Sequence, residues 1–129
     1  MIFFHDFNEK ALKQVAREAD NQQLVKDVAY MRIPAYHSPE SVYVERSEKA
    51  FILGQYQKDA FRIIGLATTL DARGQGWAKL LLARAEKAAQ ERGLHVITTR
   101  SASGADFYVK RGFYVTGRRG GDFLLKKDI

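Results

Sequence analysis

The sequence contains no cysteine, so disulfide bonds, thiolate metal ligands and a cysteine nucleophile are all excluded. Histidine is scarce as well: His5, His37 and His95 are scattered along the chain without the spacing of metal ligands. We therefore expect no metal site.

Long hydrophobic runs are also missing. The apolar start, residues 1–4, reaches His5 and Asp6 at once and is too short for a membrane span or for the core of a signal peptide. By default we expect a cytoplasmic protein without a membrane partner. The 129 residues, 46% hydrophobic and 28% charged, have the balance of a globular protein and room for a single domain, residues 1–129.

Basic residues outnumber acidic ones, and the formal net charge of +6 can attract nucleic acid, an anionic membrane surface or a polyphosphorylated small molecule. No block of Lys and Arg is long enough for a nucleic-acid arm, and the aromatic residues do not alternate with basic ones as a stacking surface requires. The sequence thus does not favour nucleic acid as the main partner.

The N-terminal third has helical periodicity. Residues 2–5 can form a short strand, after which Asp6 or Asn8 supplies an N-cap for a first helix. Residues 20–21 interrupt the pattern before a second amphipathic stretch, although one bent helix fits the same pattern. Residues 31–40, which hold both prolines, are expected to form a loop.

The rest of the chain alternates between strand and helix patterns. Three β-forming runs precede a stretch of helical period that starts at Gly76, and Gly93 occupies the position of a left-handed C-cap. A strand, a short helical run and a hairpin around Gly120 and Gly121 follow. The expected strands are residues 42–46, 50–56, 61–70, 94–99, 113–116 and 123–126, and the short helical run is residues 105–111.

Two of these strands should be parallel neighbours. The strand through Thr69, a glycine turn, a helix and the strand through Ile97 make a crossover unit. Antiparallel strands before this unit and a hairpin after it predict a mixed, mostly antiparallel α/β sheet with a central parallel pair. The glycine turn is expected at the carboxyl end of that pair.

The glycine turn has the features of an anion site. Gly74 and Gly76 let backbone N–H groups approach a ligand closely, the helix that follows points its unpaired donors at the same place, and Arg73 adds a positive charge. A P-loop needs G-x-x-x-x-G-K-[ST], which is absent, and Lys79 occupies the third glycine position of a dinucleotide fingerprint. The pattern that remains is R-x-x-G-x-A.

This pattern, carried by Arg73, Gly76 and Ala78, resembles the pyrophosphate loop [QR]-x-x-G-x-[GA] of the GNAT superfamily of acyl-CoA-dependent N-acetyltransferases. The family's later pattern, N-x-x-A-x-x-[LF]-Y-x-x-x-G-F, is similar to a stretch that contains Ser101, Gly104, Phe107, Tyr108, Gly112 and Phe113. The resemblance covers essentially the whole chain. It implies the family's order of strand, two helices, three strands, helix, strand, helix and two strands.

The resemblance implies acetyl-CoA as the acyl donor, and no metal. Ser101, Gly104 and Phe107 fall in the cofactor-binding part of the second pattern. The CoA pyrophosphate would rest on Arg73 and on the backbone N–H groups of Gly74, Gln75, Gly76, Trp77, Ala78 and Lys79.

Three further residues receive roles in the same way. In the family, the strand before the turn is bulged and splayed, so Leu66 and Thr68 would offer backbone groups to the pantetheine, with the Thr68 N–H aimed at the acyl carbonyl. Tyr108 matches the tyrosine that family members often use as the general acid for the departing thiolate.

The chain departs from the family patterns in three places. Ser101 stands where asparagine is usual and Gly104 where alanine is usual; Ser101 can bind pantetheine or cap the short helix. The strand of residues 61–70 contains no carboxylate to act as a base. The remaining candidates for a base are Glu45, Tyr56 and His37.

The function implied by the resemblance is transfer of an acetyl group from acetyl-CoA to a primary amine, by direct attack in a ternary complex. The acceptor, a small molecule or a protein, stays open, and so does a homodimer, which is common in the family. The alternative is a catalytically silent acyl-CoA-binding module, which the missing carboxylate favours and Tyr108 opposes.

Overall fold

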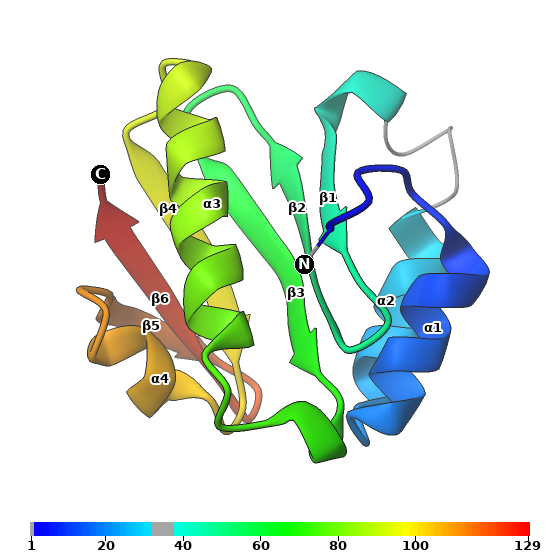
Figure 1. Ribbon diagram of the computed structural model, residues 1–129. Coiled ribbons are helices and arrows are strands. Elements are labelled where there is room, and N and C mark those ends of the chain that lie inside the picture. Colours follow the sequence, from blue (N-terminus) through cyan, green and yellow to red (C-terminus); the bar gives the residue numbers. More distant parts are fainter. Residues whose placement is uncertain (1, 32–37) are drawn as a thin grey trace.

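The computed structural model describes residues 2–31 and 38–129, and in this part of the chain a six-stranded sheet carries helices on both faces (Figure 1). The helices are α1 (Glu9–Glu18), α2 (Gln22–Met31), α3 (Trp77–Glu91) and α4 (Ala105–Val109), with short 3-10 turns at Pro39–Ser41 and Leu70–Ala72. The strands are β1 (Val42–Arg46), β2 (Ala50–Tyr56), β3 (Phe61–Thr68), β4 (Val96–Ser101), β5 (Tyr114–Arg119) and β6 (Asp122–Asp128).

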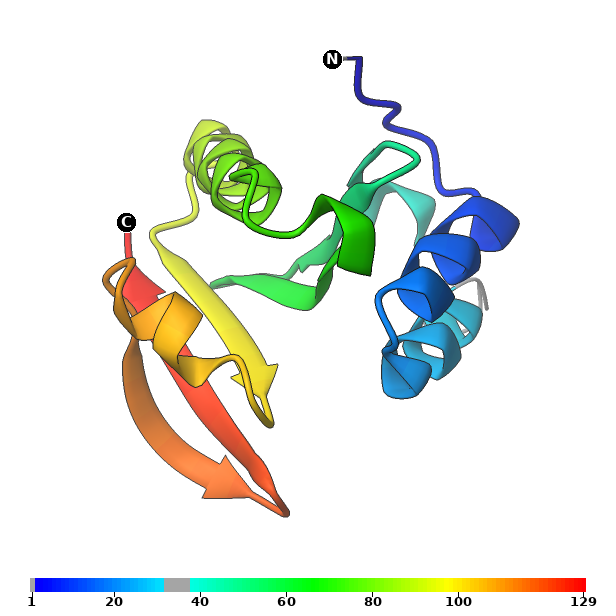
Figure 2. The same cartoon turned by 60° about the horizontal axis from the view of Figure 1, so that its bottom comes forward.

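The sheet is mixed, as the sequence predicts. Its strand order is β1-β2-β3-β4-β6-β5, and β3 and β4 are its parallel pair, while the other neighbours are antiparallel. The recorded pairing between β3 and β4 consists of Phe61 opposite Ile97 and Arg62 opposite Thr98. Beyond that point the two strands separate, so the sheet divides into a β1-β2-β3 half and a β4-β6-β5 half (Figure 2).

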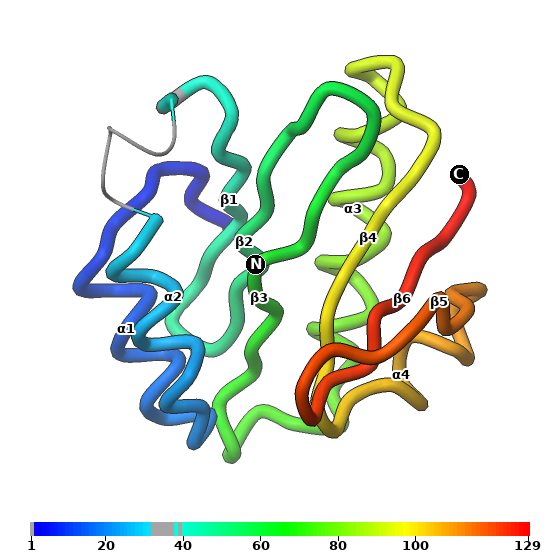
Figure 3. The backbone as a smooth tube through the Cα atoms, turned by 180° about the vertical axis from the view of Figure 1, so that it is seen from behind, coloured from blue at the N-terminus to red at the C-terminus, as the bar shows by residue number. Residues whose placement is uncertain are grey.

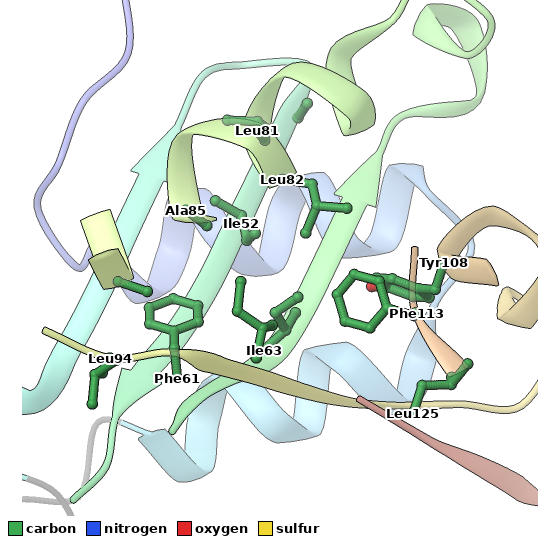
Figure 4. Close-up of a cluster of buried hydrophobic side chains, with 13 residues drawn as sticks. Ile52, Phe61, Ile63, Leu81, Leu82, Ala85, Leu94, Tyr108, Phe113 and Leu125 are labelled. Atoms are coloured by element: carbon green, nitrogen blue, oxygen red, sulfur yellow. The ribbon is translucent and has the colours of Figure 1, made fainter. Parts of the chain in front are cut away.

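Two hydrophobic clusters hold the helices on the sheet. One lies between α1, α2 and the β1-β2-β3 half, and includes Leu12, Val28 and Phe51. Helices α3 and α4 lie on the face opposite α1 and α2 (Figure 3). The other cluster lies under them and extends across both halves of the sheet (Figure 4). This second cluster contains Ile52, Phe61, Ile63, Leu81, Leu82, Ala85, Ile97, Tyr108, Phe113 and Leu125.

The first two helices are separate. Asn8 caps α1, because its side-chain oxygen accepts the Ala11 N–H at 3.0 Å. Asp20, with φ of 57°, turns the chain out of α1, and the Asn21 side chain accepts the Leu24 N–H at 3.1 Å near the start of α2. The left-handed conformation of Asp20 and the cap at Asn21 therefore resolve the choice between two helices and one bent helix.

The expected strand at residues 2–5 is absent, which is a correction to the predicted element order. A single antiparallel bridge between Phe4 and Arg46 takes its place. Ile2 and Phe4 are 79% and 55% exposed, and Phe3, which packs on Trp77, is partly buried. The segment therefore buries too little apolar surface to stabilise a full strand. The Arg46 guanidinium instead holds this segment through the Asp6 carboxylate, at 2.7 Å.

The remaining elements agree with the sequence in type and shift at their ends. Strand β3 ends at Thr68 because the 3-10 turn Leu70–Ala72 follows it. Strands β4 and β5 begin and end later than predicted, and β6 is longer at both ends. Gly120, with φ of 62°, forms the turn of the last hairpin. The expected loop at residues 31–40 lies partly outside the described residues.

Candidate active site

The glycine turn after β3 adopts a conformation that needs glycine. Gly74 has φ of 80° and Gly76 has φ of 86°, and a Cβ atom added at either position would meet nothing within 4 Å. Backbone conformation, not crowding, thus requires glycine at both positions. The open space above the two glycines leaves their backbone accessible to a ligand.

The N-terminus of α3 presents free donors at this turn. The first recorded helical hydrogen bond runs from the Leu80 N–H to the Gly76 carbonyl, at 3.0 Å. Within residues 2–31 and 38–129, no acceptor is recorded for the backbone N–H groups of residues 74–79. These donors and the positive end of the helix dipole form a cradle for a phosphate or pyrophosphate.

Side chains brace the turn from two directions. The Arg73 guanidinium donates to the Ala19 carbonyl at the end of α1, at 2.9 Å, so this predicted ligand residue also ties the turn to the first helix. Asp71 accepts hydrogen bonds from Lys49 and Thr69, each at 2.6 Å. The hydrogen bond from Lys49 and then that from Thr69 lower the pKa of the Asp71 carboxyl.

Trp77, the first residue of α3, is partly buried and packs against the hydrophobic cluster under α3 and α4. Its indole N–H donates to the Gln75 side chain at 3.2 Å, and its ring meets Phe3 edge-on at 6.1 Å between centroids. The side chains of Gln75 and Trp77 are therefore engaged with each other, while their backbone N–H groups stay at the cradle.

Strand β3 turns unpaired backbone groups toward the separation between the two halves of the sheet. The Thr69 N–H donates to the Lys49 carbonyl on the β2 side at 2.8 Å. Because backbone groups alternate in direction along a strand, those of Leu66 and Thr68 point the other way, toward β4. The recorded β3–β4 pairs stop at Arg62, so these groups are available to a ligand lying in the gap.

A bulge in β3 accompanies this separation. Leu53 of β2 lies opposite Gly65 and Gly54 lies opposite Ile63, which leaves Ile64 as an extra residue. The missing side chain of Gly65 makes room for α2, since a Cβ atom there would lie 2.1 Å from Cδ1 of Leu24. The structure thus contains the bulged and splayed strand that the sequence resemblance implies.

Tyr108 lies on α4, packed between two aromatic neighbours. Its ring meets Phe107 at 5.2 Å and Phe113 at 5.1 Å between centroids, and 7% of the residue is exposed (Figure 4). Burial raises the pKa of the Tyr108 phenol, and a hydrogen bond with the Thr99 side chain opposes this shift. The phenol therefore keeps its proton at neutral pH.

The two departures in the second motif are coupled in space. The Ser101 hydroxyl accepts the Gly104 N–H at 2.7 Å, so this serine organises the start of α4. A Cβ atom on Gly104 would lie 2.9 Å from the same hydroxyl oxygen. Serine and glycine are thus mutually adapted here. The neighbouring Phe107 carries the guanidinium of Arg111 over its ring at 3.9 Å.

Glu45, the first candidate for a base, is engaged by other side chains. It is 4% exposed, and its two oxygens accept the Tyr43 hydroxyl at 2.6 Å and the Arg84 Nε at 2.5 Å. Burial, followed by the hydrogen bond to Glu45, raises the pKa of Tyr43. This group lies between β1 and α3, and sequence reasoning missed it because Arg84 is far from Glu45 in the chain.

Of the other two candidates for a base, Tyr56 is the one that the structure describes. Tyr56 lies opposite Phe61, at the paired end of β3, with the Arg92 guanidinium 4.0 Å above its ring. Burial raises the pKa of Tyr56, while the charge of Arg92 opposes the shift. His37 lies outside the described residues.

Within the described residues, no group of three or more His, Asp or Glu side chains is arranged to hold a metal ion. In the same residues, no helix has the length and apolar character needed to cross a membrane.

Comparison with known proteins agrees with this geometry. The family model described as an acetyltransferase (GNAT) domain matches residues 15–115. A search of the curated proteins finds no match.

Several solved structures share the fold along the whole chain. The PaiA N-acetyltransferase from Thermoplasma acidophilum, in complex with coenzyme A, has 18% identity and a TM-score of 0.76, with 100% of both chains covered. The aminoglycoside 6'-N-acetyltransferase from Enterococcus faecium has 17% identity and a TM-score of 0.75, with 99% of this chain and 97% of that chain covered. Because the family model covers most of the sequence, the chain belongs to the GNAT acetyltransferase family.

Proposed function

We propose that residues 1–129 form a single N-acetyltransferase domain, which transfers an acetyl group from acetyl-CoA to a primary amine by direct attack in a ternary complex. The observation that carries this proposal is the adjacency of two features of β3. Its unpaired edge at Leu66 and Thr68 leads directly into the donor cradle at Gly74 and Gly76. A long ligand with a pyrophosphate at one end and amides along its length suits this arrangement.

The donor would be held mainly by backbone groups. The N–H groups of residues 74–79 would bind the pyrophosphate, and the edge of β3 would bind the pantetheine amides. Ser101, Gly104 and Phe107 would border the pantetheine from the β4 side. A solved relative of the same fold, PaiA, is in complex with coenzyme A. When bound, acetyl-CoA supplies an activated thioester.

The acyl carbonyl would accept the Thr68 N–H, which stabilises the negative charge that develops on oxygen when the amine attacks. The new C–N bond forms, the C–S bond breaks, and the sulfur leaves as a thiolate. Tyr108 would give its proton to that thiolate and regain one from water, and the amine nitrogen would release its extra proton to water. The raised pKa of Tyr108 keeps the phenol protonated at rest. Because a phenol is a weaker acid than a thiol, the transfer to sulfur also needs assistance from the surrounding groups.

The amine would attack in its neutral form. Strand β3 contains no carboxylate, and both oxygens of Glu45 are occupied by Tyr43 and Arg84. We therefore expect kcat/KM to rise with pH along the ionisation of the acceptor amine itself. A basic limb that stays at one pH for amines of different pKa would instead show an enzymatic base, with Tyr56 and His37 as the remaining candidates.

An amine-library screen tests the activity. Thiol release from acetyl-CoA is measured against primary amines of different size and charge, with binding of CoA measured in parallel. Thiol release that depends on the amine supports the transferase. CoA binding without turnover on any amine supports the silent acyl-CoA-binding module, for which the engaged Glu45 is the favouring observation.

The variant Tyr108→Phe tests the general acid. We expect turnover to fall by about 100-fold or more, the usual range for loss of a general acid, at unchanged affinity for CoA. Because the ring packing with Phe107 and Phe113 is retained, thermal stability should change little. Unchanged turnover would remove Tyr108 from the mechanism.

A further inference from the structure

One face of the β4-β6-β5 half lies open beside the gap in the sheet. Helix α4 packs on β5 and β6 from one side, whereas α1 and α2 pack on β2 and β3 (Figure 2). On the face opposite α4, the residues described in the structure include the exposed Arg100 and Tyr114. This open face borders the separation between β3 and β4.

A row of side chains crosses this face at the point where β3 and β4 begin to separate. Arg62 lies opposite Thr98, Thr98 opposite Lys126, and Lys126 opposite Tyr114, so one row spans four strands. The flanking residues Phe61, Ile97 and Leu125 are buried under α3 and α4. Because side chains alternate between faces, the row points to the opposite, open face.

The row carries two positive charges, those of Arg62 and Lys126. No ion pair is recorded for Arg62 or Lys126 within residues 2–31 and 38–129. The neighbouring Arg100 is already paired with Asp122. The Asp128 carboxylate lies two residues from Lys126 on β6 and accepts the Tyr114 hydroxyl at 3.4 Å.

We propose that Arg62 and Lys126, the basic row, bind an anionic group of the acceptor, so that the substrate is a primary amine bearing a carboxylate or a phosphate. This inference rests on the proposed acetyl transfer. Two strand spacings separate the Cα atoms of Arg62 and Lys126, roughly 10 Å, and both side chains are long enough to meet at one anion. A guanidinium can hold a carboxylate or a phosphate with two parallel hydrogen bonds.

The position of the basic row also sets the length of the acceptor. Leu66 lies four residues beyond Arg62 on β3, roughly 13 Å along an extended strand. Part of that distance is covered by the arginine side chain. The amine and the anion of the acceptor should therefore be separated by several bonds, as in an aminoalkyl carboxylate.

Matched acceptors test this specificity. The value of kcat/KM is measured for 6-aminohexanoate against hexylamine, and for 6-aminohexyl phosphate against 6-aminohexanol. We expect the anionic member of at least one pair to be preferred by about 10-fold or more, and the pair that shows the larger ratio identifies the anion. Because the charges are exposed, the preference should fall as NaCl is raised. Equal values within both pairs would overturn the inference.

Arg62→Gln and Lys126→Gln should each reduce the preference for the anionic acceptor several-fold. Lys87→Gln, a change of the same charge on the exposed side of α3, is the matched control and should leave the ratio unchanged. An equal decrease in all three variants would show a general effect of net charge and would overturn the assignment to the basic row.

Binding measured without turnover separates this inference from the proposed activity. Saturation-transfer NMR compares N-acetyl-6-aminohexanoate and N-acetyl-6-aminohexyl phosphate with N-hexylacetamide, in the presence of CoA. Tighter binding of an anionic product, lost in Arg62→Gln, supports the basic row even if no amine is acetylated. Turnover of amines without any anion preference in either assay leaves the acetyltransferase intact and overturns the basic row.

Discussion

The two halves of the sheet differ in how completely they are covered. In the β1-β2-β3 half, α1 and α2 pack on one face and α3 on the other, and β2 is buried along its first five residues. In the β4-β6-β5 half, α4 covers one face, and no residue of β5 is buried. The first half is thus covered on both faces, and the second keeps a free face next to the gap.

Helix α3 forms one ion pair with each half of the sheet. Arg84 pairs with Glu45 of β1 at 2.5 Å, and Glu86 pairs with Lys127 of β6 at 2.6 Å. The same helix presents its N-terminus to the glycine turn. The element that forms the anion cradle therefore also sets the spacing of the gap.

Loss of packing where the two halves of the sheet meet should have the largest effect on the free energy of unfolding. Phe61 is fully buried, and its ring meets Tyr43 at 5.5 Å and Tyr56 at 5.4 Å. We expect Phe61→Ala to lower the free energy of unfolding by about 3–5 kcal/mol, measured by urea denaturation. Tyr114→Ala, on the open half, should cost about 0.5 kcal/mol or less. Equal losses would contradict the contrast between the halves.

Adding one methyl group should also change the stability differently in the two halves. In Gly65→Ala the new Cβ would lie 2.1 Å from the Leu24 side chain, and we expect a loss of about 1–3 kcal/mol from overpacking. In Gly117→Ala on β5 the nearest contact is 3.9 Å, and stability should be unchanged or slightly higher. Thermal unfolding of both variants measures the difference. An unchanged melting temperature of Gly65→Ala would show that α2 shifts freely on β3.

Backbone strain at the glycine turn should weaken the binding of CoA. Gly76 has φ of 86°, so Gly76→Ala forces a side chain into the left-handed region at a cost of about 1–2 kcal/mol. If that strain is relieved by moving the N–H groups, affinity for CoA should fall about tenfold, measured by calorimetry. Gly121→Ala, where a Cβ atom meets nothing within 4 Å and φ is not positive, is the control. Unchanged affinity would exclude the predicted geometry of the cradle.

A double-mutant cycle should detect the coupling in the second motif. Gly104→Ala brings a Cβ atom to 2.9 Å from the Ser101 hydroxyl, so we expect a loss of about 1 kcal/mol. Ser101→Ala removes both the hydrogen bond and the close contact. The double variant should therefore be more stable than the sum of the single losses by about 0.5 kcal/mol or more. Additive losses would show that the two positions act independently.

The smallest expected effect is the pH dependence of the Asp71 interaction. The hydrogen bonds of Lys49 and Thr69 lower the pKa of Asp71 in the folded protein, so the unfolded chain binds a proton more readily. Their contribution is present above the unfolded pKa, about 4, and is lost as pH falls through the lower folded pKa. The stability difference between the wild-type protein and Asp71→Asn should therefore shrink below about pH 4. A difference that is constant from pH 3 to pH 6 would contradict this linkage.

Local signals predicted most of the elements, and the predictions that failed depended on contacts between distant segments. The Asn8 cap, the glycine positions and the β-forming runs identified α1, α3 and the ranges of β1 and β2. Residues 2–5 looked like a strand because they begin with an apolar run, but they bury little of that surface and form a single bridge. The placement of Glu45 could not be predicted, because its partner Arg84 comes from a distant helix.

By itself, the sequence determined the mixed sheet and the glycine turn, since helix caps, strand patterns and left-handed glycines depend on neighbours in the chain. Only the tertiary structure decided which polar side chains are free. It buries Glu45 against Tyr43 and Arg84, commits Ser101 to the start of α4, and brings Arg62 and Lys126 onto one row across the gap. Strand order and register, which arise from contacts between distant segments, control those outcomes.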